Sequence, residues 1–317
     1  MRTENGWDID SLATVTTRYF NGGPQRNRLH YGSIMLAARF FPGSLPMQSD
    51  TRPVALITGA GSGLGAAMAG RFAAEGWRVI VTDQHIDRAE KVTAGLAGTD
   101  HAARALNVTD SSQWEALAEF VGAEYGRIDL LVNNAGVATG GMLGETPLED
   151  WEWVLEINLM GVVRGCHHFV GRFRKQGFGH IVNVASWAGL AAAPGIASYG
   201  TAKAAVVSMS EMLRAELAPY GVEVSVLCPA FVKTALTDSM RAPDDTYAKR
   251  VQRWMEHSGV SADDVAEIVF KATRKPKFLL LTHPETRWQY RLKRWSPSLY
   301  FRILMRTMRK LMPKPDG

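Results

Sequence analysis

The stretch "PVALITGAGSGLG" (residues 53–65) decides the fold, because an apolar run leads directly into a glycine-rich turn. A helical pattern, "AAMAGRFAAEG", follows at residues 66–76. A strand, a glycine-rich turn and a helix in this order let backbone N–H groups approach a pyrophosphate and direct a helix N-terminus at its charge. Such turns also close many loops for steric reasons alone, so the motif needs support from the rest of the chain.

Five further apolar runs follow, each separated from the next by a segment of helix length. They are "RVIVT" (78–82), "IDLLVN" (128–133), "HIVNVA" (180–185), "VEVSVLC" (222–228) and "KFLLLT" (277–282). Apolar strands that alternate with amphipathic helices predict βαβ units and a parallel sheet covered on both faces. We therefore expect an α/β fold, a doubly wound parallel sheet of Rossmann-like type, in a single domain at about residues 53–282.

The composition is that of a globular protein, with 46% hydrophobic and 21% charged residues in a chain of 317. No apolar run approaches the roughly 20 residues that a membrane-spanning helix needs. Acidic residues near the N-terminus, Glu4, Asp8 and Asp10, are foreign to a secretory signal. The two cysteines are far apart and show no disulfide or metal-ligand spacing. We therefore expect a cytoplasmic protein with reduced thiols and no metal site.

Two flanking segments differ from this domain. Residues 1–52 show no sustained periodicity and contain the turn-forming "NGGP" and "FPGS", so we expect a poorly ordered extension. Met47 is a candidate alternative start. The net charge of +5 is uneven, because 13 Lys/Arg and two acidic residues from Lys271 onward give that part +11 and leave −6 for the rest. Residues 283–317 are predicted to form a basic tail.

Within this tail, residues 298–312 show the pattern of an amphipathic helix. One face carries Arg302, Arg306, Arg309 and Lys310, and much of the rest is occupied by Leu299, Ile303, Leu304, Met308 and Leu311. Such a helix suits an anionic membrane surface, which would make the protein peripheral at a membrane. It equally suits packing against the acidic body of the same subunit or a partner subunit. No nucleic-acid-binding motif accompanies the charge, so no nucleic acid partner is expected.

An acidic residue supports the interpretation of the glycine-rich turn. Asp83 comes directly after the second run, 18 residues beyond Gly65. A carboxylate at this place accepts hydrogen bonds from the ribose hydroxyls of NAD and repels the additional phosphate of NADP. Neither Ser62 in the turn nor Gln84 after the acid is basic, so NAD is favoured and NADP is the weaker alternative.

The stretch "SYGTAKAAV" (198–206) places Tyr199 and Lys203 one helical turn apart, with small residues between them. The spacing alone arises readily by chance, and such a pair is otherwise a packing tyrosine and a solvated lysine. Its surroundings add weight, because the fourth apolar run ends just before Ser186, at the sheet edge where ligands of doubly wound folds bind. Asn158 lies in a long helical segment, "EDWEWVLEINLMGVVRG".

Several features of the sequence belong to one pattern: Thr58–Gly65, "NNAG" (133–136), Asn158, Ser186, Tyr199, Lys203 and "CPAFVKT" (228–234). Together they resemble the short-chain dehydrogenase/reductase family, over about residues 53–282. The resemblance implies that Tyr199 is the catalytic acid/base, that Lys203 lowers its pKa and holds the nicotinamide ribose, that Ser186 binds the reacting oxygen, and that Asn158 anchors a relay water. It implies cofactor contacts from Gly59, Ser62, Gly63, Leu64, Gly65, Asp83, Asn107, Val108, Asn134, Ala135, Gly136, Tyr199, Lys203, Pro229, Val232 and Thr234.

The chemistry of the tyrosine agrees with this assignment. Phenol titrates near pH 10, so lowering its pKa toward 7 requires roughly 4 kcal/mol of differential stabilisation. A lysine on the next helical turn and a positively charged nicotinamide would supply it. Gly200, Thr201 and Ala202 would then be small because the cofactor packs against them.

The sequence departs from the family pattern at two positions. Pro229–Ala230 replaces the usual Pro-Gly, so the turn after that strand must avoid positive φ and the placements of Val232 and Thr234 are less secure. Asn107 replaces the usual acidic residue at the adenine amine, and its carbonyl can accept that hydrogen bond without a charge.

The substrate is expected to be apolar. Residues 235–260 are predicted to fold over it, with Leu236, Met240 and Trp254, and Trp187 and Phe231 lie nearby. No basic side chain is clearly placed to bind a carboxylate or phosphate. The sequence thus predicts an NAD-dependent enzyme acting on an apolar secondary alcohol or ketone, as a homodimer or homotetramer. The alternatives are an NADPH-dependent ketone or ketoacyl reductase and a catalytically idle dinucleotide sensor or scaffold.

Overall fold

The computed structural model describes residues 50–243 and 245–311. The extension expected at residues 1–52 therefore lies almost wholly outside the described residues, and so does the candidate start at Met47. The last residues of the basic tail, 312–317, also lie outside them.

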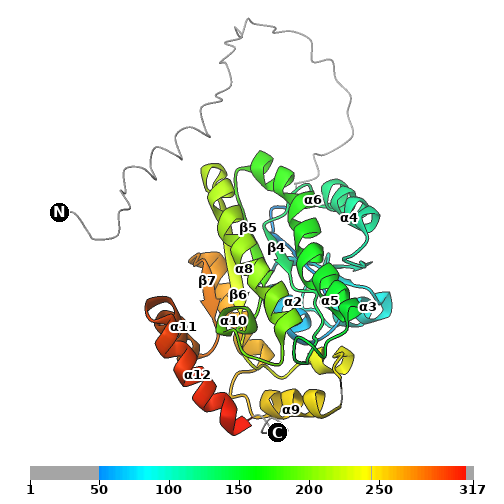
Figure 1. The fold of residues 1–317 in the computed structure, drawn as a ribbon. Coiled ribbons are helices and arrows are strands. Elements are labelled where there is room, and N and C mark those ends of the chain that lie inside the picture. The colour runs from blue at the N-terminus through cyan, green and yellow to red at the C-terminus, as the bar shows by residue number, and fades with distance from the viewer. Residues whose placement is uncertain (1–49, 244, 312–317) are drawn as a thin grey trace, which may run out of the picture. The chain divides into compact units, whose positions relative to one another are not determined.

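A parallel sheet of seven strands, in the order β3-β2-β1-β4-β5-β6-β7, lies at the centre of the described residues (Figure 1). The strands are β1 (Val54–Ile57), β2 (Arg78–Asp83), β3 (Ala102–Ala105), β4 (Leu130–Asn133), β5 (Gly179–Val184), β6 (Val222–Cys228) and β7 (Leu279–Leu281). The chain runs outward from β1 through β2 and β3 and then returns to place β4 on the other side of β1. This is the order of a doubly wound sheet, so the predicted fold class is confirmed.

Six strands coincide with the apolar runs of the sequence, and β3 is the exception. Its sequence, "AARA", consists of three alanines and one arginine, all half-buried or exposed. Because β3 is an edge strand that pairs with β2 alone, it needs few large apolar residues. Its sequence pattern is correspondingly weak.

Strand β1 shows why the inner strands are apolar throughout. Val54 and Leu56 belong to the core cluster on one side of the sheet, and Ala55 and Ile57 belong to the cluster on the other. Successive side chains of a strand point to opposite faces, so a sheet covered on both faces has no polar alternation.

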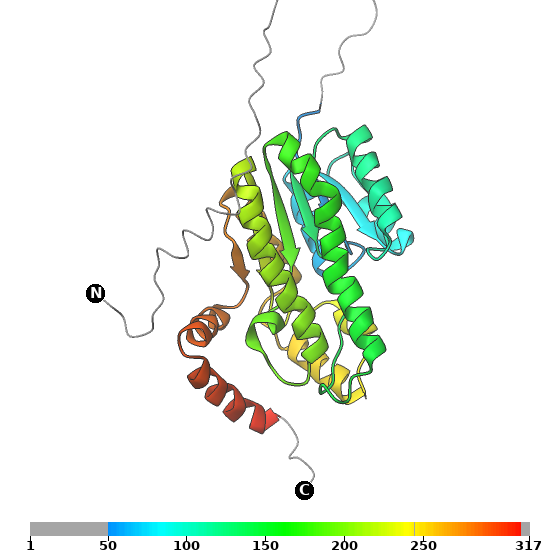
Figure 2. The same cartoon turned by 45° about the horizontal axis from the view of Figure 1, so that its top comes forward.

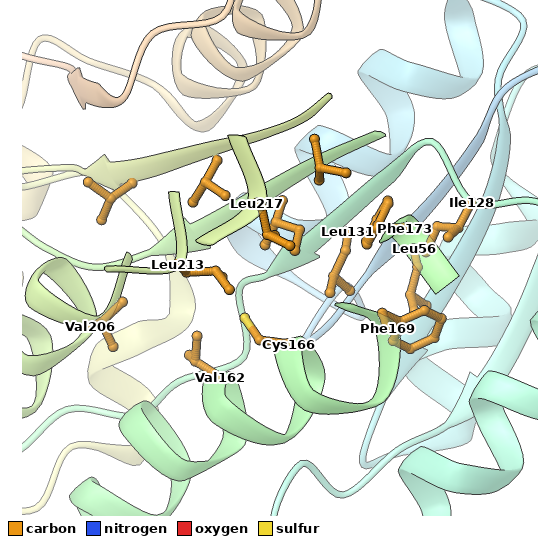
Figure 3. Packing of buried hydrophobic residues seen from close by; sticks show 14 of the residues in the cluster. Leu56, Ile128, Leu131, Val162, Cys166, Phe169, Phe173, Val206, Leu213 and Leu217 are labelled. Carbon is orange, nitrogen blue, oxygen red and sulfur yellow. The ribbon is translucent and has the colours of Figure 1, made fainter. Parts of the chain in front are cut away.

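Helices cover both faces of the sheet. One face is covered by α4 (Ser111–Glu124), α6 (Gly161–Gln176) and α8 (Ala197–Leu217), and the other by α2 (Gly63–Ala74), α3 (Ile86–Ala94) and α10 (Ala262–Arg274). Figure 2 shows α6 and α8 side by side in front of the sheet, and Figure 3 shows the core beneath them, where Phe169 and Phe173 of α6 lie in one cluster with Leu213 of α8.

Local signals fix several helix ends. The Asp110 carboxylate caps α4 by accepting hydrogen bonds from the backbone N–H of Ser112 (2.9 Å) and Gln113 (3.3 Å). Ser261 and Asp264 form a reciprocal capping box at the start of α10. These ends depend on neighbours in sequence and therefore follow from the sequence directly.

The segment predicted as one long helix around Asn158 is continuous but not uniform. Helix α5 (Leu148–Leu155) passes through a π-helical turn (Glu156–Met160) into α6. A π-helical turn within an α-helix is rare and is frequent at functional sites. Asn158 lies in the middle of this turn and is fully buried.

The remaining helices lie at the carboxyl end of the strands. They are the short α7 (Ala188–Ala191), α9 (Asp245–Glu256), α11 (Pro284–Trp295) and α12 (Pro297–Leu311). Figures 1 and 2 show α11 and α12 following β7 and lying at the same end of the sheet as α9. Among the described residues, no helix combines the length and the apolar character that crossing a membrane requires.

A buried polar network ties α6 and α8 to the middle of the sheet. The Asn133 amide donates to Asn183 Oδ1 (2.9 Å), and the Asn183 amide donates to the Ser210 hydroxyl (3.0 Å). Gly165 of α6 lies against this network. A Cβ atom at residue 165 would collide with Asn133 Oδ1 and lie 2.9 Å from the Trp114 ring.

Two glycines of α6 should therefore respond oppositely to alanine. Gly165→Ala should lower the free energy of unfolding by about 1–3 kcal/mol, because it overpacks a rigid buried site. Gly171→Ala should raise it by about 0.5–1 kcal/mol, because nothing lies within 4 Å of the added methyl group and glycine weakens a helix interior. Urea denaturation of the two variants measures both changes. Equal effects at the two positions would contradict the packing described for α6.

Candidate active site

One cavity of about 1150 Å³ extends along the carboxyl ends of the strands. It begins at the glycine-rich turn after β1 and at the end of β2, and it passes the ends of β4, β5 and β6. Strands β1 and β4 are neighbours from which the chain departs in opposite directions, and a crevice opens between their ends. The order of the strands therefore places most of the predicted site residues around this one cavity.

The glycine-rich turn is held by the segment after β4. The Thr58 hydroxyl accepts hydrogen bonds from the backbone N–H of Asn134 (2.9 Å) and Ala135 (3.0 Å). The Asn134 amide donates to the backbone carbonyls of Thr58 (2.8 Å) and Gly59 (3.2 Å). Asn134 was predicted to bind the cofactor, but its amide group is engaged in bracing the turn that would do so.

Five residues of the turn were predicted to contact the cofactor, and four of them line the cavity: Gly59, Ser62, Gly63 and Leu64. Gly65 is not among the lining residues. A Cβ atom there would lie 2.5 Å from the Gly59 carbonyl oxygen and 2.7 Å from the Asn134 amide nitrogen. Gly65 is therefore required for the close packing of the helix behind the turn, and its contact with the cofactor stays a prediction.

Asp83 lies at the end of β2, where the sequence predicted it, and is 8% exposed. Its carboxylate accepts hydrogen bonds from the backbone N–H of Gly61 (3.2 Å) and His85 (3.0 Å). Each carboxylate oxygen keeps a free lone pair for a further donor. Asp83 also lines the cavity, so a ligand hydroxyl can reach it.

Arg88 is a cavity residue that sequence reasoning missed. It lies on α3, and an added Cβ at Gly61 would be 2.7 Å from both Arg88 Cβ and Asp83 Oδ2. The arginine follows Asp83 by five residues, and only the turn between β2 and α3 brings the two together. A search for basic residues across the first turn of the helix after β2 would have found it.

The segment after β3 contributes Asn107 and Val108 to the cavity wall. The Asn107 side-chain carbonyl accepts hydrogen bonds from the Thr109 N–H (3.1 Å) and hydroxyl (2.9 Å). Val108 is buried, and its backbone carbonyl accepts from the Trp114 indole (3.1 Å). The Asn107 carbonyl is thus largely occupied, which leaves its amide N–H groups for a ligand.

The turn after β6 forms without positive φ at Ala230, as the replacement of glycine required. Pro229, Val232 and Thr234 all line the cavity. Thr234 approaches the glycine-rich turn so closely that a Cβ at Gly63 would lie 3.3 Å from Thr234 Cβ. The turn with alanine in place of glycine therefore still brings these residues to the cavity wall, and their contacts with the cofactor stay a prediction.

Ser186, Tyr199 and Lys203 line the same part of the cavity. The Ser186 hydroxyl oxygen is fixed by the Ala188 N–H, which donates to it at 3.1 Å. The Lys203 ammonium donates to the Val184 carbonyl at 2.9 Å and lies 5.8 Å from the centre of the Tyr199 ring. The serine at the end of β5 and the tyrosine and lysine of α8 thus meet at one point.

Burial governs the ionisation of these groups. It lowers the pKa of the Lys203 ammonium to about 8, so this group is still protonated at pH 7. It raises the pKa of the Tyr199 phenol, a rise that a hydrogen bond with Ser186 partly offsets. Burial also raises the pKa of the neighbouring Cys228 thiol to about 12, which keeps that thiol neutral. Lys203 is therefore the cation beside the phenol at neutral pH.

Asn158 lies one layer behind the cavity wall. Its side-chain oxygen accepts from the Val137 N–H (2.8 Å), and its amide donates to the Val137 carbonyl (2.9 Å). Gly136, the neighbour of Val137, has room for no side chain, because a Cβ there would lie 3.0 Å from Asn158 Oδ1 and 3.4 Å from Lys203 Nζ. The side chain of Asn158 therefore positions the strand end beside Lys203.

The small residues between Tyr199 and Lys203 lie where α8 meets α7. Gly200, Thr201 and Ala202 do not line the cavity. Helix α7 packs against α8 here, so closely that a Cβ at Gly189 would lie 2.6 Å from the Lys203 carbonyl carbon. The expectation that the cofactor packs against these residues stays a prediction, and the contact between the two helices accounts for Gly189 independently of any cofactor.

The residues present fit a nicotinamide dinucleotide. The cavity is continuous from Asp83 and the glycine-rich turn to Tyr199 and Lys203. Gly63 and Gly136, which line this cavity, add no side chain to its wall beside Thr234 and Lys203. Backbone N–H groups at the start of α2 suit the pyrophosphate of such a ligand, and the carboxylate of Asp83 suits the hydroxyls of its ribose.

Beyond the catalytic groups, the cavity is lined by the apolar residues that the sequence indicated: Trp187, Phe231, Leu236, Met240 and Trp254. It is also lined by side chains of α11 and α12, which sequence reasoning did not place there. Tyr300 Oη donates to the Ala191 carbonyl at 2.8 Å and anchors α12 to α7. One face of α12 therefore packs against the body of its own subunit. This is the packing interpretation of the tail that was given above as the alternative to a membrane surface.

The chain is similar to known proteins over the part that carries this site. The family model for short chain dehydrogenase matches residues 53–245. The protein called probable oxidoreductase EphD of Mycobacterium tuberculosis is 35% identical over 253 residues, which are 76% of this chain and 43% of that protein. This chain thus spans about two fifths of the length of that relative.

Two further similarities cover nearly the whole of the matched protein. The NADP-dependent (R)-specific alcohol dehydrogenase of Lentilactobacillus kefiri is 31% identical over 71% of this chain and 91% of that protein. A crystal structure of a short chain dehydrogenase/reductase from Burkholderia phymatum in complex with NAD matches with a TM-score of 0.74 and 34% identity, over 80% of this chain and 96% of that one.

The buried ammonium of Lys203 predicts a pH-dependent difference in stability between the wild type and a Lys203→Met variant. The pKa is about 8 in the folded protein and near 10.5 when the side chain is exposed, so the unfolded chain binds more protons between these values. The free energy of unfolding of the wild type relative to the variant should therefore rise with pH, by about 2 kcal/mol from pH 7 to 9.5. Urea denaturation at the two pH values measures this. A difference that stays constant or falls would show that Lys203 is not buried as a cation.

Proposed function

The chain belongs to the short chain dehydrogenase family, whose members are oxidoreductases that bind a nicotinamide dinucleotide, and from that premise we propose a specific reaction. The protein oxidises an apolar secondary alcohol or reduces the corresponding ketone, with NAD as cofactor and Tyr199 as the acid/base. The observation that carries this proposal is the convergence of Ser186, Tyr199 and Lys203 on a cavity that starts at Asp83.

The roles of the three side chains follow from their geometry. The Ala188 N–H donates to the Ser186 oxygen at 3.1 Å, while the Ser186 hydroxyl itself has only a long hydrogen bond, 3.5 Å, to the Pro229 carbonyl. The hydroxyl can therefore turn from that carbonyl to a stronger acceptor, such as the oxygen of a bound alcohol or ketone. Tyr199 takes the alcohol proton during oxidation and returns it during reduction. When bound, the nicotinamide accepts or supplies the hydride.

Lys203 makes the phenol acidic enough for this exchange. Its charge is retained at neutral pH because the Val184 carbonyl solvates the ammonium inside the protein. A cation held at this distance, with little water between, favours the phenolate over the phenol. Asn158 supports the site by fixing Val137, and any contact it makes with a relay water would involve its backbone, since its side chain is engaged.

NAD is the favoured cofactor because a carboxylate, Asp83, occupies the end of β2. A 2′-phosphate close to that carboxylate would be repelled. Arg88 is the observation in favour of NADP, since it stands beside the same carboxylate and a guanidinium binds phosphate well. Both charges face the same part of the cavity, so the preference depends on which of them a ligand approaches more closely.

The protein should assemble as a homodimer or homotetramer. In the family, the long helix that carries Asn158 and the helix that carries Lys203 form the subunit contact. Met160, in the first of these, is 39% exposed, and Met212, in the second, is 58% exposed. Apolar side chains on these surfaces support a buried contact.

The outer face of α12 supports the proposal of an anionic membrane surface as a further partner. Arg302, Arg306 and Arg309 are exposed, and Phe301 beside them is 60% exposed. Basic side chains next to an exposed aromatic ring are typical of helices that lie at a lipid interface. The opposite face of the same helix lines the cavity, so the two partners would not compete.

The assignment of Tyr199 is tested with Tyr199→Phe. This variant should lose about 10²- to 10⁴-fold in kcat, because it lacks the group that transfers the proton, while the Kd for NADH stays within about twofold. Tyr220→Phe, at an exposed position, serves as the matched control and should keep full activity. A fully active Tyr199→Phe enzyme would refute the acid/base role. Loss of activity with an intact cellular role would favour the dinucleotide sensor instead.

Cofactor preference is tested by titrating the protein with NADH and NADPH and following nicotinamide fluorescence. The wild type should bind NADH at least tenfold more tightly, because Asp83 repels the 2′-phosphate. Asp83→Ser should reduce or reverse this preference for NADH over NADPH, since Arg88 can then bind the 2′-phosphate without an adjacent carboxylate. Adding Arg88→Ala to this variant should remove the gain in NADPH affinity. Tighter binding of NADPH by the wild type would support the alternative of an NADPH-dependent reductase.

A further inference from the structure

The cavity continues well beyond the groups that carry out the reaction. The continuation, here called the distal arm, is lined by apolar side chains of three helices: Val251, Trp254 and Met255 of α9, Trp288 and Leu292 of α11, and Tyr300, Ile303, Leu304 and Met308 of α12. The glycine-rich turn and Asp83 belong to the opposite end of the cavity. The reaction proposed for Tyr199 makes no use of the distal arm.

Helix α12 presents one regular face to this space. The residues of α12 that line the cavity have the spacing i, i+3, i+4, i+7, i+8, which places them on one side of the helix. They are Tyr300, Ile303, Leu304, Thr307 and Met308. From Tyr300 to Met308 the helix rises about 12 Å. The apolar face is therefore long enough to lie beside many consecutive methylene groups of an extended alkyl chain.

This face is fixed relative to the catalytic groups. Tyr300 Oη donates to the Ala191 carbonyl (2.8 Å), and Lys293 Nζ donates to the Leu190 carbonyl (2.5 Å). Both acceptors belong to α7, which begins two residues after Ser186. Tyr300 is only 8% exposed, so these contacts are built into the structure. The position of α12 is thus tied to the segment that carries the catalytic serine.

The charges around the cavity exclude an anionic ligand from the distal arm. Among the lining residues that the structure describes, the lysine and arginine residues are Arg88 and Lys203, in the cofactor and catalytic parts, and the histidines are His85, His257 and His283. Asp238 and Glu285, which also line the cavity, would repel a carboxylate or phosphate. An uncharged apolar chain, in contrast, finds indole, aliphatic and thioether side chains along its length.

We propose that the distal arm binds the alkyl chain of a long-chain secondary alcohol or ketone whose carbinol or carbonyl carbon lies at Ser186 and Tyr199, and that Leu304 sets the limit on chain length. The inference rests on the proposed function and specifies its substrate class. In the oxidation, the C–H and O–H bonds of the carbinol break. The carbon gives a hydride to NAD and the oxygen gives its proton to Tyr199, which leaves the ketone and NADH.

A homologous series of 2-alkanols, from 2-butanol upward, tests this inference. Each methylene that enters the arm should raise kcat/KM about fourfold, which is the effect of burying one CH₂ group. The rise should end once the chain has passed the apolar face of α12. Leu304→Trp, which fills the arm, should lower the ratio of long-chain to short-chain kcat/KM and move the end of the rise to shorter chains.

Leu299→Trp is the matched control. Leu299 lies on the same helix, is 38% exposed and does not line the cavity. This variant should show the chain-length profile of the wild type. Circular dichroism of both variants distinguishes a filled arm from an unfolded helix.

Calorimetric titration with a long-chain 2-alkanone gives a second readout that does not need turnover. The wild type and Leu299→Trp should bind it, and Leu304→Trp should bind it at least tenfold more weakly. Activity on short alcohols without any rise along the series, or identical profiles for the two tryptophan variants, would overturn the distal arm and leave the proposed function intact. If no alcohol is oxidised although NADH binds, the proposed function fails, and the calorimetric difference between the variants still decides whether the arm binds the chain.

Discussion

A lysine ammonium sealed inside the protein, with one backbone carbonyl as its hydrogen-bond acceptor, is the constraint on which the site depends. The carbonyl belongs to Val184 at the end of β5, and Lys203 extends from α8, so the bond ties the helix to the sheet at the point where chemistry is proposed. The free energy needed to bury an ammonium without a hydrogen-bond partner is far larger than the free energy needed to bury one bonded to a carbonyl. Gly136 lies beside the ammonium, since a Cβ there would be 3.4 Å from Lys203 Nζ, and Asn158 holds the neighbouring Val137 in place. Gly189 instead lets α7 approach the backbone of Lys203.

Much of this site could be predicted from the sequence, because its parts are recognised locally. The glycine-rich turn, Asp83 and the pair Tyr199 and Lys203 each stand at a strand end or within one helical turn. The sheet edge that brings them together follows from the strand order alone. The fold class was predictable for the same reason, since strands buried on both faces are apolar throughout.

What the sequence did not predict depends on contacts between distant segments. Gly65 packs against Gly59 and Ala60 of its own turn and also against Asn134, some 70 residues away, and this last contact has no local signal in the sequence. Arg88 reaches the cavity only because α3 folds back over the end of β2. Strand β3 is too weakly apolar to be recognised without β2 beside it. The amphipathic pattern of α12 was visible, but a helical pattern alone does not say which surface covers its apolar face.

The position of α12 links the distal arm to the acidity of Tyr199. Any wall that excludes water from the cavity lowers the local dielectric constant and so strengthens the effect of the Lys203 charge on the phenol. The same desolvation destabilises both charged groups, since burial raises the pKa of Tyr199 and lowers that of Lys203. Lys203 has Val184 to offset this cost, whereas the phenolate has the Ser186 hydroxyl and the lysine. An apolar chain that fills the arm would complete the exclusion of water, so a long substrate would promote the proton transfer as well as bind more tightly.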